Sequence, residues 1–333
     1  MKNKIFIIAE AGVNHNGKLS MAYKLIDKAA KSKVDAIKFQ TFTADNLVTK
    51  SAPLAKYQKK NIKIKSQYEL LKKLEFTKYM HLKCINRCKL KNIKFISSPF
   101  DISDILFLKK LKLDIFKIPS GEITNFPYLK FLAKLKKKII LSTGMCTTNE
   151  ISNAINIFFK YGVKKKDITL LHCNSSYPTP YEDVNLKSML FLKKKFNLKI
   201  GLSDHSLGIE VPIAAAALGA KVIEKHFTLN RNLIGPDHKS SIEPKELSEM
   251  VKSIRKIELA LGKEQKKITK SEMKNIKIVR KSIVAKKFIA SGELFTLDNI
   301  AFKRPGFGVS PMYVNRYVGK KAKKNFKKDS FIK

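Results

Sequence analysis

The chain has 333 residues, a length that fits one barrel domain of about 250 residues together with a smaller unit. Its formal net charge of +41 would suit a nucleic-acid binder, but only six of its 68 basic residues are arginine and the lysines are spread evenly, so we expect no nucleic-acid partner. The longest apolar stretch, residues 211–220, is too short to span a membrane, and the four cysteines show no disulfide framework, which favours a cytoplasmic protein with no membrane partner.

Eight short apolar runs, each ending in polar residues, recur along the chain. They cover residues 5–9, 36–39, 95–98, 115–120, 139–143, 168–174, 199–205 and 221–226. Segments of helical length lie between or after them, such as residues 19–32, 68–90, 148–161, 211–218 and 245–261. Strands that alternate with helices predict a parallel sheet, and eight such units are the number in a closed (β/α)8 TIM barrel. The chain is therefore predicted to be an α/β protein whose chemistry lies at the carboxyl ends of the strands.

The predicted barrel occupies residues 1–262 and is followed by a lysine-rich, partly helical linker over residues 263–281. Short β-like pieces and turns then occur at residues 282–285, 291–293, 294–295 and 304–306. They indicate a small β-rich domain over residues 282–333. A core of about 50 residues is near the lower limit for independent stability, so we expect this domain to pack against the barrel or a second subunit.

His205 and His226 end the predicted seventh and eighth strands. Neighbouring parallel strands lie about 4.8 Å apart, so two imidazoles at these ends could reach one ion. Two histidines with water and a substrate oxygen would suit Mn²⁺ as a Lewis acid, with Mg²⁺ or Co²⁺ as alternatives. The other interpretation is that both rings only form hydrogen bonds at the strand ends.

Lys38 and Lys117 are charged residues inside apolar strands, and a buried ammonium group needs an anion beside it. Phosphate or carboxylate would serve, because serine and threonine residues supply further donors at the same end of the barrel. These are Ser98, Ser120, Ser142, Thr143 and Ser203. The set predicts a site for a phosphorylated carboxylic acid. Alternatively, the two lysines form structural ion pairs with Glu10 or Glu122.

Glu10 and Glu122 also stand at strand ends, where they could act as general acid and base or could only orient other groups. Tyr177 and Asp237 lie in loops just after the sixth and eighth strands. Both are candidates for contacts to sugar hydroxyl groups, or are simply turn residues.

Nine motifs spread in order over the chain resemble the bacterial sialic acid (N-acetylneuraminate) synthases and the related legionaminate synthases. They are EAGVNHNG (10–17), KFQT (38–41), KIPSGE (117–122), LSTGM (141–145), HCNSSYPTP (172–180), GLSDHS (201–206), EKHFTL (224–229), GPDHKSS (235–241) and KRPGFGVSP (303–311). The resemblance covers essentially the whole chain. It implies condensation of phosphoenolpyruvate with an N-acetylmannosamine-type sugar, which releases phosphate and gives a nine-carbon 2-keto acid.

The family's functional residues carry over by position. Residues that match phosphoenolpyruvate contacts are Lys38, Ser98, Lys117, Ser120, Ser142, Ser175 and Ser203. Residues that match sugar contacts are Gln40, Tyr177, Asp237 and Arg304, the metal ligands match His205 and His226, and the catalytic carboxylates match Glu10 and Glu122. One departure is Ser175, at which some family members carry asparagine.

The last domain is similar to the family's antifreeze-like SAF (β-clip) domain. The resemblance implies a domain-swapped homodimer in which Arg304 reaches the partner's barrel and meets the N-acetyl group of the sugar. N-acetylmannosamine is the expected acceptor, and 2,4-diacetamido-2,4,6-trideoxymannose, which gives N,N'-diacetyllegionaminate, is the alternative. A phosphorylated sugar and a pseudaminate precursor are less favoured by the motifs.

Overall fold

The computed structural model describes residues 4–54, 64 and 66–333. The chain divides into two compact units, Met1–Gly262 and Lys263–Lys333. Within the described part of the chain, no helix is both long enough and apolar enough to cross a membrane.

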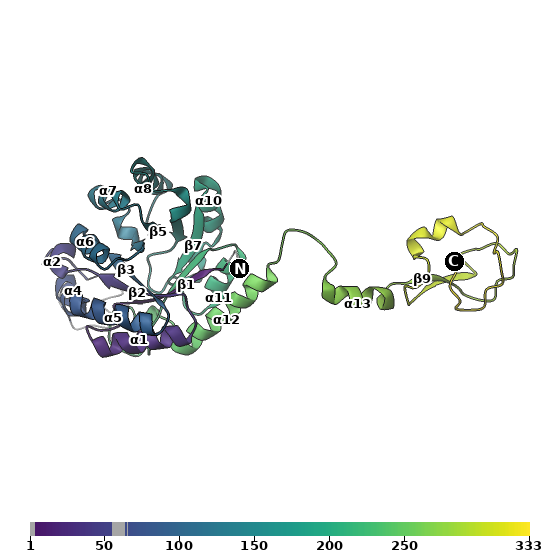
Figure 1. The fold of residues 1–333 in the computed structure, drawn as a ribbon, viewed down its shortest axis with the longest axis horizontal. Helices are drawn as coiled ribbons and strands as arrows, with labels where there is room; N and C mark the ends of the chain where they lie inside the picture. Colours follow the sequence, from purple (N-terminus) through teal and green to yellow (C-terminus); the bar gives the residue numbers. More distant parts are fainter. Residues whose placement is uncertain (1–3, 55–63, 65) are drawn as a thin grey trace. The chain divides into compact units, whose positions relative to one another are not determined.

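The first unit is built on eight parallel strands. They are β1 (Phe6–Gly12), β2 (Ala36–Thr41), β3 (Lys94–Pro99), β4 (Ile115–Ile118), β5 (Lys138–Ser142), β6 (Ile168–His172), β7 (Lys199–Asp204) and β8 (Val222–His226). The hydrogen-bonded order is β3-β2-β1-β8-β7-β6-β5-β4, and the two end strands, β3 and β4, also contact each other. The sheet therefore curves into a barrel, which confirms the predicted TIM-barrel fold, and each predicted apolar run overlaps one strand (Figure 1).

Helices connect the strands and cover the outside of the barrel (Figure 1). They are α1 (Leu19–Lys31), α2 (Ala44–Leu47), α4 (Gln67–Leu74), α5 (Lys78–Leu90), α6 (Ile102–Lys110), α7 (Phe126–Lys134), α8 (Thr148–Lys160), α9 (Tyr181–Val184), α10 (Lys187–Phe196), α11 (Glu210–Ala217) and α12 (Pro244–Ala260). Apolar side chains at helical spacing face the strands, as Leu25, Ile26 and Ala29 do on α1. This packing places the main apolar core between the strands and the helices.

Residues 68–90, expected as one helical segment, form the two helices α4 and α5. The chain leaves the helical path at Glu75, and Phe76 turns into the core, where its ring stacks on Phe39 with 4.7 Å between centroids. The Thr77 hydroxyl then accepts a hydrogen bond from the Met80 N–H and begins α5. The expectation was wrong because burial of Phe76 and this cap outweigh the helix propensity of the intervening residues.

The interior of the barrel changes character along its strands. The part of the interior nearer the amino ends of the strands is filled by the apolar side chains of Ile8, Ala36, Ile96, Ile140, Leu171 and Val222. Alternate residues of a strand point to the same side, so the next inward positions are two residues further on. These positions hold Glu10 after Ile8 and Lys38 after Ala36, both of them buried. The barrel is therefore apolar below and charged toward the carboxyl ends of its strands.

The second unit consists of α13 (Lys270–Val279), the antiparallel pair β9 (Ser282–Ala285) and β10 (Ile300–Lys303), and the 3-10 segment η4 (Pro311–Arg316). Its small core contains Ile283, Ala285, Ile289, Phe295, Ile300, Ala322, Phe326 and Ile332. The strand expected at residues 294–295 is wrong, since Leu294 forms only an isolated bridge with Lys321. The sequence did not indicate β10 because this strand is short and mostly exposed, and therefore shows no clear alternation.

Candidate active site

A cavity of about 470 Å³ opens at the carboxyl ends of the strands. Most of the predicted site residues line it, namely Glu10, Lys38, Gln40, Ser98, Lys117, Ser120, Ser142, Ser175, Tyr177, Ser203, His205 and His226. The strands deliver these side chains directly or through the first residues of the following loops. Residues far apart in the sequence are thus brought into one polar chamber above the apolar interior.

Four other predicted residues lie elsewhere. The buried Thr143 hydroxyl donates a 2.9 Å hydrogen bond to the Leu171 carbonyl and does not line the cavity. Asp237 is buried in the wall of a smaller cavity of about 110 Å³, which is also lined by His226. Glu122 is half-buried in the 3-10 turn η1 (Ser120–Glu122), where its carboxylate accepts a 2.7 Å hydrogen bond from Asn125 Nδ2. It is not among the side chains that line these two cavities. Arg304 is exposed on the second unit.

Two lysines and two glutamates form the floor of the larger cavity. Lys38 Nζ lies 2.8 Å from Glu10 Oε2 and 3.7 Å from Glu224 Oε1, and Lys117 Nζ lies 3.1 Å from the same Glu224 oxygen. The Ser203 hydroxyl donates a 3.0 Å hydrogen bond to Glu224. All four charged side chains are almost fully buried, so each one depends on the others for compensation.

Glu224 is a site residue that the sequence reasoning missed. The alternative interpretation had paired the lysines with Glu10 or Glu122, and this is correct for Lys38 with Glu10 but wrong for Lys117, whose partner is Glu224. The signal was present in β8, because a period of two that places His226 inward places Glu224 inward as well.

The pKa values of the two glutamates are shifted in opposite directions. Burial raises the pKa of Glu10 to about 7, although the nearby Lys38 ammonium acts against this rise. Burial also disfavours the charged form of Glu224, but the ammonium groups of Lys117 and Lys38 prevail and lower its pKa to about 2. Glu224 therefore remains a fixed anion, whereas Glu10 is able to hold or release a proton near neutral pH.

The rings of His205 and His226 stand side by side above this floor, with 5.2 Å between their centroids. Tyr177 stacks on His205 at 4.2 Å and meets His226 edge-on at 5.5 Å. Burial lowers the pKa of His205 to about 4 and that of His226 well below its usual value. Both rings are consequently neutral at physiological pH and carry lone pairs.

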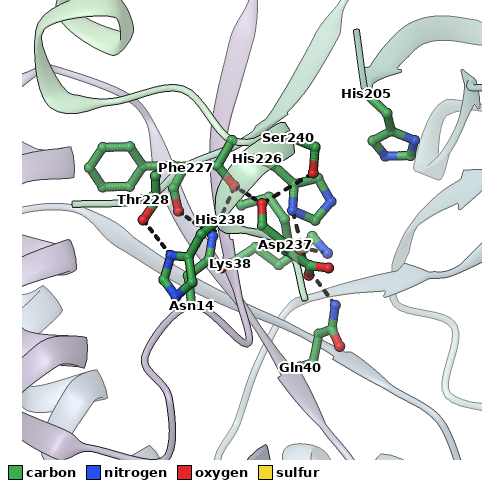
Figure 2. A network of polar contacts seen from close by, with 12 residues as sticks. Asn14, Lys38, Gln40, His205, His226, Phe227, Thr228, Asp237, His238 and Ser240 are labelled. Atoms are coloured by element: carbon green, nitrogen blue, oxygen red, sulfur yellow. Dashed lines mark hydrogen bonds and ion pairs between the residues drawn. The ribbon is translucent and has the colours of Figure 1, made fainter. Parts of the chain in front are cut away.

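The surroundings of the two imidazoles fit a metal ion. His205 donates through Nδ1 to the Asn174 carbonyl at 2.5 Å, so Nε2, 3.4 Å from the Ser203 hydroxyl, carries the lone pair. His226 Nδ1 is buried, forms no hydrogen bond with any described residue, and lies 3.9 Å from Asp237 Oδ2 (Figure 2). The described residues contain no cluster of three or more His, Cys, Asp or Glu side chains suited to a metal, so any further ligands would come from water or substrate.

Asp237 is held in position by the loop that follows β8. Its backbone carbonyl accepts hydrogen bonds from the hydroxyls of Ser240 at 3.1 Å and Ser241 at 2.6 Å. Burial raises the pKa of the Asp237 side chain to about 6. The neighbouring His238 bonds Thr228 at 2.6 Å and fixes the same loop (Figure 2). These hydrogen bonds hold the loop so that the Asp237 carboxyl group is directed toward His226.

The opposite wall is formed by serines around Gly144. The Gly144 N–H donates to Ser120 Oγ at 2.9 Å, and a Cβ at this glycine would lie only 2.5 Å from Ser175 Oγ. A side chain here would therefore force the serines apart. Ser142 Oγ is buried and has no hydrogen-bond partner among the described residues, so the wall offers unsatisfied polar groups to a ligand.

Comparisons with known proteins agree with this geometry. A model described as the NeuB family matches residues 25–266, and a model of the SAF domain matches residues 280–333. N,N'-diacetyllegionaminic acid synthase of Campylobacter jejuni is 53% identical over 99% of both chains. The enzyme of the same name from Legionella pneumophila is 45% identical over 96% of this chain and 91% of its own. The crystal structure of N-acetylneuraminic acid synthetase from Leptospira borgpetersenii in complex with citrate has a TM-score of 0.72 and 40% identity, covering 82% of this chain and 90% of that one.

Replacing Glu224 by glutamine should lower the free energy of unfolding at pH 7 by about 3 kcal/mol, because two buried ammonium groups would lose a shared anion. Urea unfolding measures this change. Because the native pKa of Glu224 is lowered from 4.5 to about 2, the difference from wild type should be complete above pH 4.5 and shrink as the pH falls toward 2. The matched control is the exposed Glu249→Gln, and equal stability of both variants would contradict the role of Glu224.

Proposed function

Since the chain belongs to the NeuB family of sialic-acid-type synthases, we propose that it condenses phosphoenolpyruvate with an open-chain acetamido sugar and water, giving a nine-carbon 2-keto acid and phosphate. The observation that carries this proposal is that Lys38 and Lys117 line the same cavity as two neutral imidazoles. Ammonium groups suit the phosphate and carboxylate of the first substrate, and a polarised aldehyde suits the second.

Phosphoenolpyruvate would occupy the floor and the serine wall. Lys38 and Lys117 would face its anionic groups, and the unsatisfied Ser142 hydroxyl would donate to it. The remaining proposed contacts are Ser98, Ser120, Ser175 and Ser203, which line the same cavity. We propose that phosphoenolpyruvate bound here directs C3 of the enol toward the histidine pair, where the aldehyde carbon of the sugar would lie.

His205 and His226 would hold a divalent ion, Mn²⁺ by preference, and such an ion supplies Lewis-acid polarisation of the sugar aldehyde. The proposed sugar contacts are Gln40, Tyr177 and Asp237, which surround this pair. Because the pKa of Asp237 is raised to about 6, its side chain can either donate to or accept from a sugar hydroxyl near neutral pH.

The bond changes follow from this placement. The C2–C3 π electrons of phosphoenolpyruvate attack the aldehyde carbon, and a positive centre develops at C2, which the fixed anion Glu224 stabilises. Water adds at C2, and one of its protons passes to the former aldehyde oxygen, which becomes a hydroxyl group. The bond between C2 and the phosphate oxygen then breaks, and the added hydroxyl gives its remaining proton to the leaving phosphate as the ketone forms. Glu10 is placed to exchange a proton in these steps because its pKa is about 7, and Glu122 remains a second candidate for activating water.

For the acceptor we propose 2,4-diacetamido-2,4,6-trideoxymannose ahead of N-acetylmannosamine. Two relatives with 53% and 45% identity carry the name N,N'-diacetyllegionaminic acid synthase. The rim of the cavity is also apolar, being lined by Leu47, Val48, Leu71, Phe100 and Met145. Such a rim suits a methyl group at C6 and a second acetamido methyl better than a hydroxyl or phosphate. The Leptospira relative, named for N-acetylneuraminic acid, supports the other sugar.

Phosphate release should be measured with phosphoenolpyruvate and Mn²⁺ and one of three sugars: the diacetamido sugar, N-acetylmannosamine or its 6-phosphate. We expect release with the diacetamido sugar and at least tenfold less with the other two, since each lacks the second acetamido group and adds a polar group at C6. Preference for N-acetylmannosamine would replace the acceptor but keep the reaction. No release with any sugar by folded protein would overturn the reaction itself.

Alanine at His205 or His226 should abolish turnover and Mn²⁺ binding without unfolding the barrel, because each removes half of the protein's ligands to the ion. Circular dichroism checks the fold, and titration followed by the EPR signal of free Mn²⁺ checks binding. The control is His238→Gln, in which the ring that bonds Thr228 beside the site is changed but neither proposed ligand is lost. Unimpaired Mn²⁺ binding by both alanine variants would refute the metal assignment.

We further propose a domain-swapped homodimer in which Arg304 caps the sugar in the partner's barrel. Arg304 is exposed next to the exposed Phe302 and Phe307, and α13 exposes Met273 and Ile278. A small unit with this much uncovered apolar surface is typical of one that packs against another chain.

Arg304→Ala should raise the KM for the sugar more than the KM for phosphoenolpyruvate. At sugar concentrations far below KM, co-expression of Arg304→Ala with His226→Ala should restore about a quarter of wild-type activity, since half of the dimers would pair an intact barrel with an intact arginine. Each variant expressed alone is the control. Co-expressed chains no more active than the Arg304→Ala enzyme would contradict the swap.

A further inference from the structure

A lysine lies fully buried on the side of β8 that faces the helices. In β8 the side chains of Glu224 and His226 point into the barrel, and Lys225 therefore points outward, between Ile223 and Phe227 of the apolar core. Its side chain is 0% exposed. Lys225 Nζ donates 2.5 Å hydrogen bonds to Asp204 Oδ2 and to the Ser206 carbonyl.

Asp204 is the matching residue on β7. The ladder pairs Asp204 with Lys225, and the Asp204 side chain is also buried. Its second carboxylate oxygen accepts hydrogen bonds from the Ser206 N–H at 3.0 Å and the Ser206 hydroxyl at 2.8 Å. One ion pair thus joins β7, β8 and the turn that begins directly after β7.

The residues that make these contacts are the sequence neighbours of the two histidines of the site. His205 stands between Asp204 and Ser206, and His226 directly follows Lys225. The backbone on both sides of the first ring and immediately before the second is therefore fixed by a single network on the far side of the strands. Beyond this network, His205 is held by the Asn174 carbonyl, whereas His226 Nδ1 has no hydrogen-bond partner among the described residues.

A buried ion pair adds little to the free energy of unfolding. Removing two charges from water is costly, and apolar residues of similar size often give equal or greater stability. The surrounding core of Ile223 and Phe227 would accept such residues. What apolar residues would not provide is a directional link that sets the register and twist between two particular strand ends.

We propose that Lys225 and Asp204 are positioning residues that set the separation and direction of the two imidazoles for metal binding. This inference rests on the proposed function, because it presupposes that His205 and His226 hold a divalent ion. The pair touches neither ion nor substrate and acts only through the backbone of the residues beside it. Removing it should loosen the geometry of the ligands while leaving both imidazoles in place.

The test compares Mn²⁺ affinity and thermal stability in the full-length protein. In Lys225→Met/Asp204→Asn both charges are removed, while the asparagine oxygen still accepts the Ser206 hydrogen bonds. Free Mn²⁺ is followed by its EPR signal at a temperature at which every variant is folded. We expect affinity about 10- to 100-fold weaker than wild type, with a Tm that changes little.

The matched control is Arg87→Met/Asp27→Asn, which removes an ion pair of 2.6 Å between α5 and α1, away from the cavity. Its Mn²⁺ affinity should equal that of wild type. Ser206→Ala, a smaller change that removes one hydrogen bond to Asp204, should weaken Mn²⁺ binding several-fold and serves if the double variant does not fold.

Two failures are distinguishable. If wild type binds one Mn²⁺ per chain and both the double variant and Ser206→Ala bind it equally well, the positioning role is wrong and the metal site stands. If wild type binds no Mn²⁺ at all, the proposed metal site is wrong, and the inference falls with it.

Discussion

The mutual compensation of four buried charges underlies the whole site. Three ion pairs of 2.8–3.7 Å link two ammonium and two carboxyl groups below the mouth of the barrel. None of them would remain ionised there alone, since isolated charges in an apolar interior are too costly. The strands supply them in a ring because inward positions recur every second residue on each strand. The barrel thus provides a polar floor on an apolar base without any loop having to fold into the interior.

The inward and outward faces of β7 and β8 have different roles. Inward residues of β7 and β8 carry the serine, glutamate and histidine side chains that face the cavity, and outward residues carry the buried pair Asp204 and Lys225. The outward side chains therefore fix the position of each strand end, while the inward side chains of the same segment face the cavity. Segments beyond the strand ends then add the apolar rim, with Leu71 from α4 and Met145 from the loop after β5.

Much of this arrangement follows from the sequence, for identifiable reasons. Periodicity located all eight strands, and the polar ends of the runs located the histidine pair, because both signals are local. Glu224 was missed because its partner Lys117 is 107 residues away, and a charged strand residue alone does not reveal which charge it meets. The break between α4 and α5 was missed for a similar reason, since Phe76 is drawn inward by Phe39 of another element. Tertiary pairing, unlike periodicity, cannot be predicted from neighbouring residues.

The apolar lower part of the barrel also shapes the order of events. Among the described residues, six apolar side chains fill the interior beneath the charged floor, so the floor is closed on that side. In a cavity closed on that side, the substrate that binds deepest has to enter before the one that covers it, and the product has to leave before either substrate binds again. For a reaction of two substrates this favours compulsory-order kinetics, with the anionic substrate first, as a consequence of architecture and not of affinity.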